Sequence, residues 1–239
     1  MTTTTKTTNF LRHMVLSVVP FVCAFSFASL QASAQNSGTM GAHLQTVVYD
    51  GSTRAGWYSF PGQQPKLRFK GDLVNITSRK HSTVLLSRLA DSSTSAAEVS
   101  LTRAPISTSS ISGLAVLSDA QHALVIGLEG GSVVLWDLNP DAARVLARQP
   151  VNSSSPLEFR VSGNQASSVR FFWRHQGDSA WHPLGDADSA KLLNNWRDPI
   201  HFGLLLDGPQ GSQVTFSNYR AVSADMARNS MPATLINGR

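Results

Sequence analysis

The chain has 239 residues, with 20 lysines and arginines against 15 aspartates and glutamates, and a formal net charge of +5 at pH 7. The basic residues are scattered singly and show no sequence stripe suited to a phosphate backbone, which argues against nucleic acid as a partner. Cys23 is the single cysteine, so the chain beyond it has no disulfide, thiolate metal site or cysteine nucleophile.

The N-terminal segment has the pattern of an export signal. Lys6 and Arg12 precede an apolar run from Met14 to about Leu30, and Ala32-Ser33-Ala34 follows as a small-x-small site. We predict a signal peptide over residues 1–34 and a secreted, periplasmic or extracellular protein without a membrane span after its removal. An uncleaved anchor is the alternative, but Pro20 interrupts the run. Removal leaves 20 minus 2 basic residues against 15 acidic ones, about +3.

The rest of the chain is predicted to be one β domain over residues 49–222, between a flexible leader (35–48) and a flexible tail (223–239). Several segments alternate apolar with polar residues, as strands with one wet face do. They are Leu67–Lys70, Glu98–Thr102, Leu157–Val161 and Val214–Ser217.

Other segments are apolar throughout and predict central strands buried on both faces. They are Gly113–Leu117, Leu124–Leu128, Val133–Leu138 and Phe202–Leu206. Ser118–Gln121 and Glu129–Ser132 fit the short turns between such strands, and only Asp188–Trp196 looks helical. About twelve strands without intervening helices indicate an all-β, antiparallel sandwich.

The stretch VRFFWRHQGDSAWHPLGD, residues 169–186, predicts an aromatic hairpin. His175-Gln176-Gly177-Asp178 forms its turn, Phe171 and Trp173 share one face of the first strand, and Phe172 lies on the other. We expect Trp181 on the returning strand to stack on the ring of Phe171 or of Trp173.

Five segments in this order resemble one known module. They are LRFKGD, SGLAVLSDAQHALVIGL, VRFFWRHQGDSAWHPLG, HFGLLL and VTFSNYRAV. Together they are similar to the C-terminal concanavalin A-like β-sandwich (jelly roll) of β-xylosidase and arabinofuranosidase glycoside hydrolases, over about Gly51 to Val222. Two departures matter for function: Ser87-Arg88-Leu89-Ala90 stands where the family has A-R-R-Q, and Asn218 replaces its usual Asp.

The sequence offers no catalytic cluster. The resemblance implies hydrolysis by carboxylates on a separate propeller, and no segment here predicts propeller blades. Glu98, Glu129 and Glu158 are isolated in sequence, whereas glycoside cleavage needs two carboxylates close together. The histidines lack zinc spacing. No cofactor is expected. A structural calcium ion is left open, and its candidate ligands are Asp50, Asp72, Asp137 and Asp207.

Carbohydrate binding needs less than catalysis. Trp136 and Trp173 are the predicted exposed rings for stacking on sugars, with Arg88 and His122 as polar partners on strands that the resemblance places in the same sheet. Trp57, Trp181 and Trp196 are expected to be packing residues. The sequence therefore predicts an exported, non-catalytic module that binds carbohydrate or cell-surface glycan.

Two other functions remain open. An envelope structural or interaction protein would use an apolar sheet face against a protein partner. A small glycoside hydrolase, or an accessory subunit that completes one in trans, would need a cleft holding two carboxylates.

Overall fold

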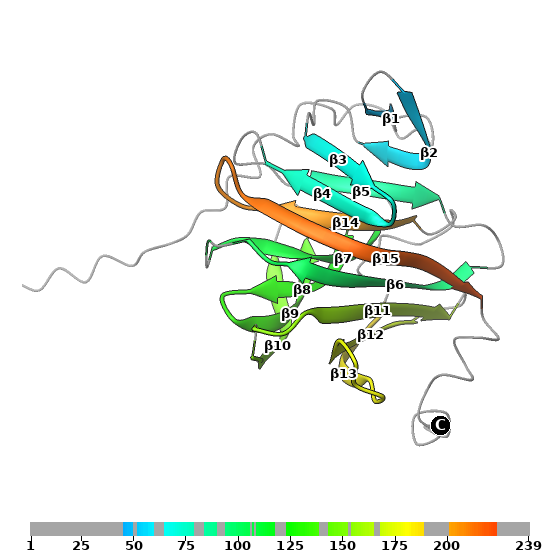
Figure 1. The fold of residues 1–239 in the computed structure, drawn as a ribbon. Helices are drawn as coiled ribbons and strands as arrows, with labels where there is room; N and C mark the ends of the chain where they lie inside the picture. Colours follow the sequence, from blue (N-terminus) through cyan, green and yellow to red (C-terminus); the bar gives the residue numbers. More distant parts are fainter. Residues whose placement is uncertain are drawn as a thin grey trace, which may run out of the picture.

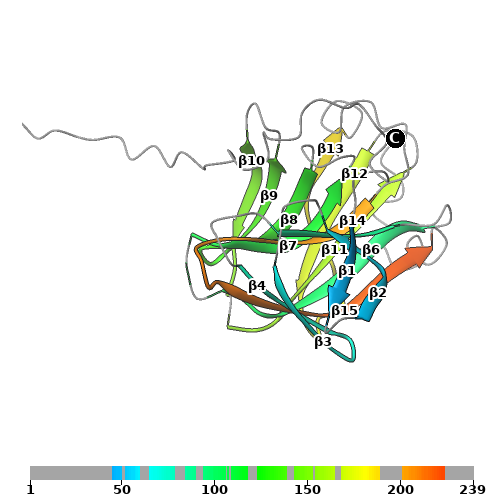
Figure 2. The ribbon, with the colours of Figure 1, turned by 90° about the horizontal axis from the view of Figure 1, so that it is seen from above.

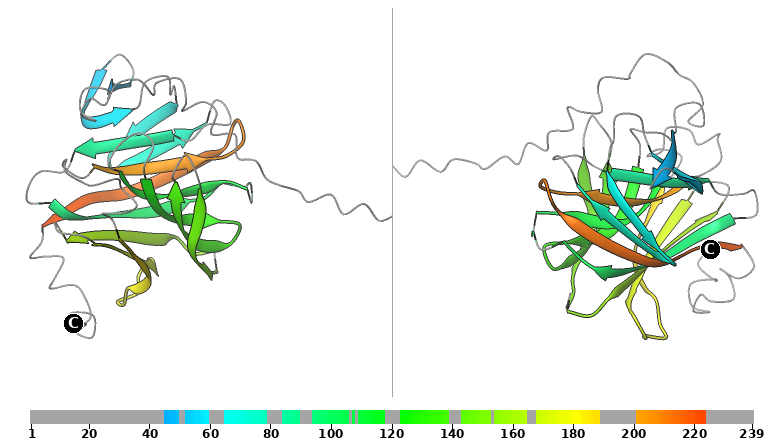
Figure 3. Two further views of the ribbon diagram at one scale, coloured as in Figure 1. Left: turned by 180° about the vertical axis from the view of Figure 1, so that it is seen from behind. Right: turned by 45° about the horizontal axis from the view of Figure 1, so that its top comes forward.

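The computed structural model describes residues 45–49, 52–59, 65–78, 84–89, 94–105, 107, 109–117, 123–138, 143–152, 154–164, 168–188 and 201–223. The expected concanavalin A-like β-sandwich is confirmed, since the described residues form two antiparallel sheets that lie face to face (Figure 1, Figure 2). Figure 3 shows the two layers from behind and in a tilted view. In the described part of the chain, no helix has the length and apolar character of a membrane span.

Several predictions from the sequence fall on residues that the structure does not describe. These are the signal peptide over residues 1–34, residues 189–196 of the helix expected over Asp188–Trp196, the turn at Ser118–Gln121 and the tail beyond Ser223.

One sheet has seven strands in the order β13-β12-β11-β6-β15-β4-β3. Their bounds are β3 Lys66–Lys70, β4 Leu73–Thr77, β6 Thr94–Arg103, β11 Leu157–Asn164, β12 Ser168–His175, β13 His182–Asp188 and β15 Gln213–Ser223. The alternating segments of the sequence all lie in this sheet. Their polar residues point away from the other sheet, which leaves one face of the seven-stranded sheet polar.

The other sheet has eight strands in the order β1-β2-β5-β14-β7-β8-β9-β10. Their bounds are β1 Gln45–Tyr49, β2 Ser52–Ser59, β5 Val84–Leu89, β7 Ile111–Leu117, β8 Ala123–Glu129, β9 Ser132–Leu138, β10 Arg144–Pro150 and β14 His201–Asp207. The predicted central strands are confirmed as β7, β8, β9 and β14, which are interior strands with almost every residue buried.

The main core lies between the sheets and combines residues from both. Large side chains fill it, among them Leu114, Ile126, Phe159, Phe171 and Phe216. A second apolar cluster lies on the opposite face of the eight-stranded sheet and consists of Ile111, Ala115, Leu117, Ala123, Val125, Val134, Trp136 and Leu205. Because successive side chains alternate between faces, an unbroken apolar strand supplies both clusters.

Two predicted turns are confirmed. Gly130 and Gly131 join β8 to β9 with φ of 54° and 81°, the left-handed values that a two-residue hairpin turn requires. In the aromatic hairpin, Gly177 has φ of 95°, and the Asp178 amide donates a hydrogen bond to the His175 carbonyl at 3.1 Å. Phe171 and Trp173 both enter the main core, as expected from their shared face.

Candidate functional site

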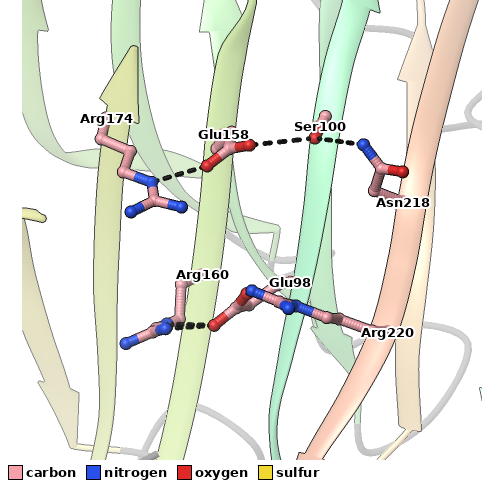
Figure 4. A network of polar contacts seen from close by, with 7 residues as sticks. All are labelled: Glu98, Ser100, Glu158, Arg160, Arg174, Asn218 and Arg220. Atoms are coloured by element: carbon pink, nitrogen blue, oxygen red, sulfur yellow. Dashed lines mark hydrogen bonds and ion pairs between the residues drawn. The ribbon is translucent and has the colours of Figure 1, made fainter. Parts of the chain in front are cut away.

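A pocket of about 370 Å³ opens on the polar face of the seven-stranded sheet. It lies over β6, β11 and β15 and reaches the turn between β3 and β4. Its lining residues are Asp72, Glu98, Val99, Ser100, Glu158, Trp181, Asn218, Tyr219 and Arg220. Two charged rows cross the strands at its floor, and Figure 4 shows both.

The first row is Arg220, Glu98 and Arg160, which are in register on β15, β6 and β11. The Arg160 Nε donates to Glu98 Oε1 at 2.5 Å, and the Arg220 Nε donates to Glu98 Oε2 at 2.6 Å (Figure 4). The side chains of Glu98 and Arg160 are only 6% and 4% exposed, whereas Arg220 is 63% exposed. Glu98 is therefore a buried carboxylate that bridges a buried and an open guanidinium.

Burial has an electrostatic effect on Arg160. Desolvation lowers the pKa of its guanidinium below the ordinary value, and the charge and hydrogen bond of Glu98 act in the opposite direction. An arginine keeps its proton at any physiological pH, so the charge stays and must be compensated. Glu98 supplies that compensation.

The second row is Arg174, Glu158, Ser100 and Asn218. The Arg174 Nε donates to Glu158 Oε2 at 2.6 Å, and the Ser100 hydroxyl donates to Glu158 Oε1 at 3.4 Å. The Asn218 amide in turn donates to the Ser100 oxygen at 3.4 Å (Figure 4). Because each side chain is held by the next strand, the row is fixed before any ligand arrives.

A bulge in β15 places the pocket residues of that strand. Between the pairs Ser217–Ser100 and Arg220–Glu98, β15 has one residue more than β6. Asn218 has φ of 53°, and it is the one described non-glycine residue with positive φ. The Tyr219 ring packs against Trp57 at a centroid distance of 5.0 Å. A bulge re-aims the side chains around it, and here Asn218 and Arg220 line the pocket as a result.

Trp181 closes one side of the pocket, but not by the contact that the sequence predicted. The guanidinium carbons of Arg160 and Arg174 lie 4.4 and 4.3 Å from its ring centroid. The ring is thus held by cation–π contacts to both charged rows. The expected stacking on Phe171 or Trp173 is wrong, because those two rings point into the core and Trp181 lies on the opposite face.

The predicted stacking rings are buried. Trp136 is 8% exposed and Trp173 is 5% exposed, so the expectation that both rings are open to solvent is wrong. The two residues also lie in different sheets, Trp136 on β9 and Trp173 on β12. Trp136 belongs to the second apolar cluster and Trp173 to the main core, because each continues the apolar face of its strand.

The predicted polar partners do not join them. Arg88 lies on β5, where its backbone pairs with Phe202, and His122 lies outside the described residues. Of the predicted ligand residues whose side chains the structure describes, Trp136 and Trp173, neither lines the pocket.

The two carboxylates of Glu98 and Glu158 could not be paired from the sequence, because the residues are 60 positions apart. Sheet pairing makes them diagonal neighbours, since Glu158 is opposite Ser100 and Glu98 is opposite Arg160. One local signal was available: both glutamates stand at polar positions of strands whose alternate residues are apolar. That signal gives the face of each residue, but not its neighbour on the next strand.

The calcium candidates do not converge in the described part of the chain. Asp137 accepts a hydrogen bond from the Arg144 Nε at 3.3 Å, and Asp72 lines the pocket. Asp50 lies outside the described residues. No group of three or more histidine, cysteine, aspartate or glutamate side chains with metal-binding geometry occurs among the residues described.

Comparison with solved structures places the fold among glycoside hydrolase structures. The chain is similar to the GH43 protein BlXynB from Bacillus licheniformis, with a TM-score of 0.58 and 15% identity over 72% of this chain. It is also similar to a xylan beta-1,4-xylosidase from Bacillus halodurans C-125, with a TM-score of 0.56 and 14% identity over 71% of this chain. The matched region is 37% of each of those chains.

This likeness confirms, at the level of fold, the resemblance drawn from the sequence to a β-sandwich module of such enzymes. The chain spans less than two fifths of the length of the structures that it matches here. A comparison with protein families finds no match, and a comparison with curated proteins finds none either.

Proposed function

We propose that this protein is an exported β-sandwich module that binds carbohydrate in the pocket over β6, β11 and β15 and does not cleave it. The observation that carries the proposal is the pair of charged rows at the pocket floor. They present fixed hydrogen-bonding groups on an open face, next to the ring of Trp181. One of the similar structures is a xylan beta-1,4-xylosidase, and a polysaccharide is the ligand class that we propose.

The size and chemistry of the pocket suit a sugar. Its volume of about 370 Å³ is near the lower end of the range for ligand pockets, roughly 300–1,000 Å³. Arg220 offers donors to hydroxyl groups, and Asp72 and Asn218 offer acceptors. Because Ser100 and Glu98 already hold Asn218 and Arg220, binding would freeze few additional rotamers.

The same contacts argue against hydrolysis at this site. Both oxygens of Glu98 accept hydrogen bonds from arginines, and both oxygens of Glu158 accept from Arg174 and Ser100. A glycosidase needs one carboxyl group that donates a proton to the leaving oxygen, and a second that attacks or activates water. Each glutamate here would have to break its existing contacts first. Incubation with polysaccharides is therefore expected to release no new reducing ends.

The direct test of the pocket is Asn218→Gly. Glycine accepts the positive φ at this position without strain, so we expect the free energy of unfolding to stay within about 1 kcal/mol of the wild type. Loss of the amide should weaken binding about tenfold, which corresponds to about 1.4 kcal/mol. A glycan array followed by calorimetric titration of the retained polysaccharide measures the effect.

Arg148→Gln serves as the control, since its ion pair with Glu129 lies in the other sheet. It should leave the affinity unchanged. Equal weakening by both variants would move the binding site away from the pocket, and a folded protein that retains no glycan would refute the proposal as a whole.

A further inference from the structure

The edge strand β3 carries three basic side chains on the same face as the pocket. Lys66, Arg68 and Lys70 are exposed, while Leu67 and Phe69 between them pack against the main core. The three residues form no continuous basic run in the sequence, because apolar residues separate them. The two-residue period of the strand brings them together on one face, and we call them the β3 basic row.

None of the ion pairs found among the described residues includes a residue of the β3 basic row. The ion pairs found there use other arginines, namely Arg144, Arg148, Arg160, Arg174 and Arg220. At the pocket floor, three arginines form ion pairs with Glu98 and Glu158, and Asp72 lines the same pocket, so three positive charges stand beside three negative ones. The three residues of the row therefore give this face of the sheet a positive excess.

The row is continuous with the pocket. Lys70 pairs with Leu73 across the Gly71-Asp72 turn, and Asp72 lines the pocket. From Lys70 to Lys66 the row extends for about 14 Å, at about 3.4 Å per residue. The surface beside it is polar: the Thr215 hydroxyl donates to Asn75 Oδ1 at 2.7 Å, and Asn75 is directly opposite Arg68.

The exposed guanidinium of Arg220 adds a cation at the pocket itself. Glu98 accepts from its Nε and from one terminal nitrogen, while the side chain remains 63% exposed. The remaining N–H groups can therefore donate to a ligand, and paired N–H donors of this kind suit a carboxylate. An anionic group of a ligand in the pocket would contact Arg220. Further anionic groups of the same polymeric ligand would contact the β3 basic row.

We propose that the ligand is an acidic polysaccharide with carboxylate-bearing sugars, which runs from the pocket along β3. This inference rests on the proposed function, because it names the ligand class of the same site. A single-stranded nucleic acid fits less well, since such ligands need open aromatic faces for stacking bases, and arginines occupy the Trp181 ring. Lysines on an edge strand also prevent that strand from pairing with another chain. That role does not require the lysines to lie next to a polar pocket.

The test compares each acidic polymer with its own neutral form. Polygalacturonate, alginate and glucuronoxylan, each beside its carboxyl-reduced product, are titrated into the purified protein at low and at high salt. We expect the acidic form to bind about tenfold more tightly at low salt, and this preference to fall as salt screens the charges.

Two variants that each remove two positive charges locate the effect. Arg68→Gln/Lys70→Gln should weaken binding of the acidic form about tenfold and leave the neutral form unchanged. Arg144→Gln/Arg148→Gln, on edge strand β10 of the other sheet, should change neither. Thermal unfolding of all proteins confirms that each variant is folded.

The other outcomes overturn the inference in distinguishable ways. If both forms bind equally and Asn218→Gly weakens both, the pocket binds sugar but the acidic ligand class is wrong. Equal weakening by the two double variants would indicate an effect of net charge rather than of the β3 basic row. If neither form of any polymer binds, the proposed function fails together with this inference.

Discussion

Replacing Glu98 by glutamine is expected to lower the free energy of unfolding by about 3–5 kcal/mol. Glu98 is the carboxylate between Arg160 and Arg220. The substitution preserves the shape of the side chain and removes its charge. The Arg160 guanidinium then stays buried without a compensating anion, which is the reason for the large loss.

Chemical denaturation of wild type and variant measures the loss. Glu129→Gln is the matched control, because it removes the same group from the pair with Arg148, which is 45% exposed. An exposed pair contributes about 0–1 kcal/mol, so this variant should remain close to the wild type. Similar losses in the two variants would contradict the view that burial makes the Glu98 contacts strong.

A second substitution separates the charge from the packing. In Glu98→Gln/Arg160→Met the uncompensated guanidinium is absent, so we expect part of the lost stability to return. The single variant Arg160→Met is measured as well. If the free energies of unfolding lost in the two single variants add up to the loss in the double variant, the two side chains act independently, and this explanation is wrong.

Replacing Gly113 by alanine is expected to lower the free energy of unfolding by about 3 kcal/mol or more. Gly113 on β7 is directly opposite Gly127 on β8. An added Cβ would lie 2.0 Å from the carbonyl oxygen of Ile126 and 2.5 Å from the Cα of Gly127. These are backbone atoms, so they can move only if the two central strands separate and their ladder weakens.

Gly71→Ala is the matched control for this prediction. A Cβ at Gly71 has no neighbour within 4 Å, but the residue has φ of +56°. Alanine in that conformation costs about 1–2 kcal/mol, which is a backbone effect without a clash. Denaturation of the two variants side by side measures the difference. Equal losses would mean that β7 and β8 can accommodate the extra methyl group.

The pattern of the sequence was sufficient for the interior strands of one sheet and for the faces of several strands in the other. Unbroken apolar segments predicted the interior strands, and alternation predicted which residues of the other sheet are polar. Both signals are local, because side chains along a strand alternate with a period of two wherever the strand lies. The tryptophans were predicted less well: Trp136 and Trp173 were expected to be open to solvent, but Trp173 is buried between the sheets and Trp136 is buried in the apolar cluster on the other face of the eight-stranded sheet.

Local patterns were enough to predict an antiparallel β-sandwich with buried central strands and a glycine turn at Gly130-Gly131. The contents of the polar face depend on which strands are neighbours in the folded protein. Arg160 and Arg220 lie 62 and 122 positions from Glu98, and pairing of β6 with β11 and β15 brings all three together. Strand order depends on packing over the whole chain, and local periodicity carries no information about it.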